Sequence, residues 1–66
     1  MTLTSGCDYV AIFMDGTTIS FKFLDNQGGI RIEVPPNSGK TAYLDQLTTQ
    51  HGGWRSITFI GCPPTP

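Results

Sequence analysis

Residues 8–24, DYVAIFMDGTTISFKFL, form two runs rich in β-branched and aromatic residues, joined by Asp15-Gly16. This dipeptide predicts a tight β-hairpin, because a type I′ turn needs positive φ at both central residues and Asp and Gly tolerate it. A two-residue loop would set Ile12 opposite Ile19 and Val10 opposite Phe21. Because side chains alternate along a strand, we expect one core face made of Val10, Ile12, Met14, Ile19, Phe21 and Phe23.

A third strand is predicted at residues 30–34, IRIEV, after the turn-forming residues 25–29. A four-residue loop would pair Phe23 with Ile30 and Phe21 with Ile32, which keeps the apolar residues of all three strands on one face. Pro35-Pro36 ends the strand, because proline has no N–H to donate to a ladder.

A helix is expected from Gly39 or Lys40 to His51, with Asn37 or Ser38 as its cap and Gly52-Gly53 after its end. Its apolar stripe would consist of Tyr43, Leu44 and Leu47, with the stem of Lys40. The last strand is expected at residues 54–60, with Ile57 and Phe59 facing the core.

The predicted fold class is therefore α+β, with the order β-β-β-α-β and one helix on one face of the sheet. We expect a four-stranded, mainly antiparallel sheet of order 3-2-1-4, with the last strand beside the first. A parallel strand beside the third is the alternative. The antiparallel arrangement sets Cys7 opposite Cys62, where a disulfide fits. A reducing cytoplasm would nevertheless keep both thiols free.

The length and charge of the chain limit its class. Sixty-six residues predict a single small domain, with loose tails at residues 1–6 and 63–66. The net charge of −1 gives no excess of Lys and Arg for nonspecific nucleic-acid binding. No apolar run is long enough to span a membrane, and the first residues lack the basic start and apolar core of a signal peptide. We expect a cytoplasmic protein without membrane contact.

No set of residues predicts catalysis, a metal site or a cofactor. The carboxylates are scattered over turns and strand ends, His51 is the only histidine, and two cysteines are too few for a structural zinc site. Gly39-Lys40-Thr41 matches the end of a phosphate-binding loop, but that motif needs a glycine where this chain has Val34. The sequence therefore predicts a protein that is not an enzyme.

The expected functional surface is the sheet face that the helix leaves uncovered. Four apolar residues of the first and last strands would face outward there: Tyr9, Phe13, Trp54 and Ile60. Exposed aromatic patches of this kind mark interfaces, although the side chains of Lys22, Arg31 and Arg55 and the proline tail could instead cover them.

We therefore predict a non-enzymatic interaction module that forms a homodimer or larger homo-oligomer and binds a larger protein partner. Small chains of this type are encoded by phages and mobile elements as inhibitors or modifiers. The alternative is a single-stranded nucleic-acid or nucleotide-binding module. In that case Tyr9, Phe13 and Trp54 would stack on bases, and the phosphates would bind Lys22, Arg31 and Arg55.

Overall fold

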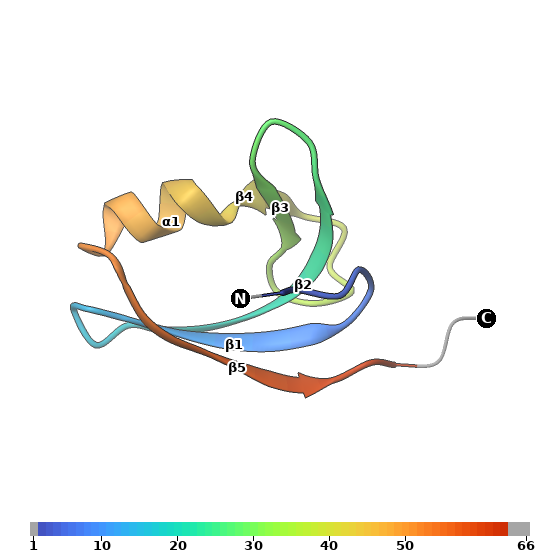
Figure 1. Cartoon of the computed structure of the whole chain (residues 1–66), viewed down its shortest axis with the longest axis horizontal. Helices are drawn as coiled ribbons and strands as arrows, with labels where there is room; N and C mark the ends of the chain where they lie inside the picture. The colour runs from blue at the N-terminus through green and yellow to red at the C-terminus, as the bar shows by residue number, and fades with distance from the viewer. Residues whose placement is uncertain (1, 64–66) are drawn as a thin grey trace.

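A computed structural model describes residues 2–63, which form an α+β fold with one short helix and an antiparallel sheet (Figure 1). In chain order the elements are β1 (Asp8–Phe13), β2 (Thr18–Asn26), β3 (Ile30–Glu33), β4 (Thr41–Tyr43), α1 (Leu44–Gln50) and β5 (Trp54–Gly61). The five strands lie in the order β4-β3-β2-β1-β5. The sheet bends, and α1 lies across the inside of the bend (Figure 1).

The predicted four-stranded sheet of order 3-2-1-4 is wrong. Residues 41–43, which were expected to be helical, form a strand that pairs with β3. Ala42 pairs with Ile32, and the residues on either side of Ala42 pair with those on either side of Ile32. β5 does lie antiparallel beside β1. The last strand is therefore where the sequence placed it, and the extra strand is at the other edge.

The β1–β2 hairpin has a loop one residue longer than predicted. Phe13 N donates to Thr17 O at 2.8 Å, and Gly16 N donates to Phe13 O at 3.0 Å, so Met14 to Gly16 form a three-residue loop. Gly16 has a φ of 91°, the left-handed conformation that such loops need at this position. The register therefore pairs Tyr9 with Phe21.

This single shift exchanges the two faces of β1, because neighbouring residues point to opposite sides of a strand. The predicted core residues Val10, Ile12 and Met14 lie outside the buried core, and Met14 is 63% exposed. The buried residues are Cys7, Tyr9, Ala11, Phe13, Phe21, Phe23, Ile32 and Leu44. The Tyr9 and Phe21 rings stack at 5.8 Å between centroids. Each fully buried large side chain stabilises the fold by about 1.5–3 kcal/mol.

The β2–β3 register also differs from the prediction. Phe23 pairs with Ile32 rather than with Ile30, and the register shifts at Leu24. Ile32 is fully buried, whereas Ile30 packs against the edge of the core. The four-residue loop is wrong because β2 continues through Asn26 and the bulge absorbs one residue.

The helix begins at Leu44, not at Gly39 or Lys40, and Asn37 and Ser38 do not cap it. Leu44 is buried against the core, and Leu47 packs at its rim. The expected end is correct: Gly52 has a φ of 79°, and Gly53 N donates to Thr48 O at 2.7 Å. Gly39-Lys40-Thr41 therefore leads into β4, whose first residue is Thr41, so it offers no helix start to an anion.

The loop between β3 and β4 is held by Glu33. The Glu33 carboxylate accepts hydrogen bonds from Asn37 N at 2.6 Å and Gly39 N at 3.1 Å. These two bonds close the chain reversal that brings residues 41–43 back alongside β3.

The chain before β1 makes several contacts with the sheet within residues 2–6, and Met1, the first residue of the predicted loose tail at residues 1–6, lies outside the described residues. Gly6 N donates to Phe23 O at 2.8 Å, Thr4 N donates to the Tyr9 hydroxyl at 2.8 Å, and Leu3 packs against the core. Cys7 and Cys62 are joined by a disulfide that links the start of β1 to the end of β5. The other predicted tail, at residues 63–66, lies outside the described residues apart from Pro63.

Candidate functional site

The outer side of β5 is the candidate site. β5 ends the sheet, and within residues 2–63 no strand pairs with its outer side. The direction of its backbone groups follows from the hairpin. Phe13 N donates to Thr17 O and Phe23 N donates to Cys7 O, so the odd-numbered residues of β1 bond to β2. Because bonding direction alternates along a strand, the even-numbered residues bond to β5.

The even-numbered residues of β1 are paired with Ser56 and Thr58. These two β5 residues therefore direct their N–H and C=O groups toward β1. By the same alternation, Ile57 and Phe59 direct theirs outward. We call these outward backbone groups of Ile57 and Phe59 the β5 edge.

Three large apolar side chains of β5 are exposed, and we call them the edge patch: Trp54 is 47% exposed, Phe59 58% and Ile60 57%. The length of α1 accounts for the exposure of Phe59. Seven residues give a helix of about 10 Å, and α1 packs over β3 and β4. Four strand spacings of about 4.8 Å separate β4 from β5, so α1 is too short to extend its cover from β4 across the sheet to Phe59.

Two bulges limit the regular part of β5. The β1–β5 register shifts between the partners of Asp8 and Tyr9, and again between those of Ile12 and Phe13. The segment from Ser56 to Phe59 lies between these shifts and is regular. Bulges are common at sheet edges, where they bend the strand and interrupt pairing. Pairing along the outer side is therefore regular only over this central segment.

The structure separates the apolar residues that were predicted to form one surface. Trp54 and Ile60 are exposed on β5, but Tyr9 is 5% exposed and Phe13 is fully buried. The predicted exposure of Tyr9 and Phe13 is wrong, because the longer hairpin loop turns this side of β1 toward the core. The uncovered face of β1 carries Val10 and Ile12 instead.

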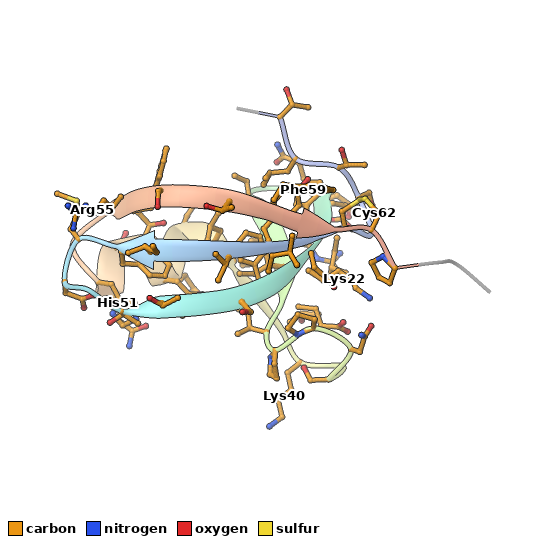
Figure 2. All side chains as sticks on the ribbon, turned by 90° about the horizontal axis from the view of Figure 1, so that it is seen from below. Lys22, Lys40, His51, Arg55, Phe59 and Cys62 are labelled. Carbon is orange, nitrogen blue, oxygen red and sulfur yellow. A yellow bond between two sulfur atoms is a disulfide. The ribbon has the colours of Figure 1, made fainter. Side chains whose placement is uncertain are left out.

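The three cationic residues of the prediction do not converge. The Lys22 ammonium donates to the Asn37 side chain, and Arg31 is 3.3 Å from the Asp25 carboxylate. Arg55 is exposed at the end of the sheet opposite Lys22 (Figure 2). The side chains of these residues therefore form no shared phosphate-binding surface with Trp54.

Phe59 is the site residue that the sequence analysis missed. The alternation of side chains along the strand predicted a core position for Phe59. Its ring does contact that of Tyr9 edge-on, at 5.6 Å between centroids. It is nevertheless 58% exposed, because β5 is the last strand on this side and α1 packs elsewhere. Figure 2 shows Phe59 near Cys62, at the same end of the sheet. Its place near the end of an edge strand was the available signal.

A second cluster joins the hairpin turn to the end of α1. His51 Nδ1 donates to Asp15 Oδ2 at 2.8 Å, and Asp15 Oδ1 accepts from Thr17 N at 2.9 Å. Hydrogen bonds to the carboxylate lower the pKa of Asp15 from 3.8 to about 2. The Thr17 backbone contributes most, followed by the Thr17 side chain and His51. The His51 ring lies 5.1 Å from that of Phe13. Sequence analysis did not bring this pair together, since 36 positions separate its members.

The Asp15–His51 pair resembles part of a catalytic triad, but neither cysteine can serve it as a nucleophile. Both cysteines are in the disulfide, so neither offers a thiol. The pair fastens the helix end to the turn, with Met14 N donating to Gly53 O at 2.8 Å beside it.

Two other kinds of feature are absent from the described part of the chain. Across residues 2–63, no three side chains of the metal-binding types come together. The same residues include no helix with the length and apolarity needed to cross a bilayer. No protein-family model, curated protein or solved structure matches this chain.

Proposed function

We propose that this protein is a non-enzymatic interaction module that binds an extended segment of a larger protein by strand addition to β5. In this mode the backbone of the added segment bonds to an unpaired strand, and side chains at alternate positions provide specificity.

One observation carries the proposal: the β5 edge and the edge patch lie on the same strand. The β5 edge offers backbone donors and acceptors at Ile57 and Phe59. The edge patch adds Trp54 and Ile60 at the two ends, with Arg55 as the only charged residue of β5. Exposed aromatic side chains and Arg are enriched at protein interfaces. An added strand would satisfy the backbone groups and cover the apolar side chains together.

Binding of single-stranded nucleic acid or a nucleotide remains a second proposal with less support. Trp54 and Arg55 are exposed neighbours that could stack on a base and contact a phosphate. Tyr9 and Phe13 are buried, so two of the three expected stacking rings cannot take part. The net charge of −1 gives no electrostatic attraction to a phosphate backbone.

The first prediction tests strand addition with a library of random peptides displayed on phage. We expect selected peptides to alternate apolar and polar residues, because an added strand places alternate side chains on opposite faces. Their binding should change the fluorescence of Trp54, the only tryptophan. Phe59→Lys should weaken binding by about 2 kcal/mol, about thirtyfold, because it places a charge on the edge.

Tyr43→Lys is the matched control, since Tyr43 is an aromatic residue exposed by 39% on the opposite edge strand. It should leave peptide affinity unchanged, and circular dichroism checks that both variants fold. Equal effects of the two substitutions, or no enriched peptide, would refute strand addition to β5. If short single-stranded RNA or DNA quenches Trp54 in a salt-dependent way while no peptide binds, the nucleic-acid proposal replaces it.

A further inference from the structure

We infer that β5 also pairs with β5 of a second copy of this chain, antiparallel about a two-fold axis at Thr58. The inference rests on the proposed function, because it uses the same strand, and it names an occupant for that strand when no partner is bound. Two-fold dimers are the commonest homo-oligomers, and an open edge strand is a template for pairing with another chain.

Backbone direction restricts how two β5 strands can pair. Only residues whose N–H and C=O groups point outward can bond to a second strand, so Ile57 and Phe59 must face outward-directed residues of the other copy. A register shifted by one residue would set Ile57 against Thr58, whose backbone groups point toward β1. The two-fold axis must therefore pass at a residue and not between two residues, and the axes that use Ile57 and Phe59 pass at Ile57, at Thr58 or at Phe59.

The two bulges decide between these axes. With the axis at Thr58, Ile57 of each copy faces Phe59 of the other, and both pairs lie within the regular segment from Ser56 to Phe59. Each pair can exchange two backbone hydrogen bonds. With the axis at Ile57, Phe59 would face Arg55, and with the axis at Phe59, Ile57 would face Gly61. Arg55 and Gly61 both lie outside the regular segment. The Thr58 axis keeps every bonded pair in regular strand geometry.

The side chains and charges agree with the Thr58 axis. Phe59 of one copy would pack beside Ile57 of the other, so an apolar residue meets an apolar residue across the axis. Arg55, the only charge on β5, lies outside the paired segment, so no like charges face each other. Each copy carries a net charge of only −1, which adds little long-range repulsion.

The size of the contact predicts a weak dimer. A standard stable interface buries about 800 Å² per partner, which is about a fifth of the 4200 Å² of exposed surface. Pairing over one short regular segment, even with the edge patch, provides less than a permanent dimer needs. The second copy should therefore dissociate readily, and a strand from a protein partner should displace it.

Engineered cysteines in the full chain test the axis directly. Thr58 is exposed, and in the inferred dimer the two Thr58 residues face each other in a non-bonded pair with Cα atoms about 4.5 Å apart. Thr58→Cys should give a disulfide-linked dimer on mild oxidation, within the usual Cα range of a disulfide. Ile57→Cys should not, because its two copies would be diagonal neighbours about 7–8 Å apart. Peptide mapping confirms that Cys7 stays bonded to Cys62.

Light scattering of the unmodified protein completes the test, from about 1 μM to about 1 mM, the range of weak association. We expect the mass to rise from 7.2 kDa toward twice that value. Phe59→Lys should keep the protein monomeric, and Tyr43→Lys should not. Preferential cross-linking of Ile57→Cys would overturn the Thr58 axis. A monomeric wild type that still binds the selected peptides through Phe59 would overturn self-pairing alone, and loss of both behaviours would overturn the proposed function as well.

Discussion

The two edges of this sheet differ in length and in what protects them. β4 has three residues and leads directly into α1, whereas β5 has eight residues and leads into the tail. One large apolar side chain is exposed on β4, that of Tyr43, and three are exposed on β5. Proteins commonly keep edge strands short or cover them, because an open edge pairs with other chains. The β4 edge follows this rule and the β5 edge does not.

The edges are also held by different means. β4 depends on the loop that Glu33 organises with two hydrogen bonds. β5 pairs with β1 along its length and is joined to it at one end by the Cys7–Cys62 disulfide. The short β4 edge is thus held by weak local bonds, and the long β5 edge by a covalent link. This contrast suggests that β5 is a stable, preorganised surface for a partner.

The largest effect should come from removing the covalent link of β5. Cys62→Ser opens a loop that spans 55 positions, and the chain-entropy model predicts a loss of about 4 kcal/mol in the free energy of unfolding. Urea denaturation of oxidised wild type and variant measures it. Reductant should lower the wild type to the level of the variant and leave the variant unchanged. A wild type that is equally stable with and without reductant would show that the link does not stabilise β5.

The contrast between the edges could be predicted only in part from the sequence. The hairpin and the third strand followed from local patterns and turn residues, and the antiparallel last strand from setting Cys7 opposite Cys62. The helix start did not, because residues 41–43 can be helical or extended, and pairing with the distant β3 decides between these states. The short β4 edge was therefore absent from the prediction.

Which residues of β1 are exposed depends on the register between β1 and β2, and the sequence left this register ambiguous. Both faces of β1 are apolar, with Val10 and Ile12 on one and Tyr9 and Phe13 on the other. Hydrophobic alternation therefore did not select a register, and the choice rested on loop length alone. The exposure of Trp54 and Ile60 agreed with the expectation. The exposure of Phe59 did not agree with the expectation, because it depends on how much of the sheet α1 covers.

A smaller effect is expected at the β4 edge. Glu33→Ala removes the acceptor of both loop hydrogen bonds, at a partly exposed position, so we expect a loss of about 1 kcal/mol. Hydrogen exchange should become faster at the amides of residues 41–43 and stay unchanged at Ser56 and Thr58. Glu33→Gln, which keeps one acceptor oxygen, should give an intermediate effect. Equal acceleration at both edges would show that the two edges do not open independently.

The smallest effect concerns the contact between the hairpin turn and the end of α1, and it depends on pH. The pKa of Asp15 is lowered in the folded state to about 2, from an ordinary 3.8. A carboxyl group with a lowered folded pKa contributes stability above its unfolded pKa and loses it as the pH falls through the folded one. We therefore expect thermal stability to fall between about pH 4 and pH 2 through this group.

Asp15→Asn is the control variant: it keeps an acceptor for Thr17 N but has no charge to lose. Its melting temperature should start lower at pH 7 and decline less than that of the wild type over this interval. Parallel declines of the two proteins would show that the Asp15 carboxylate does not stabilise the attachment of α1 to the turn.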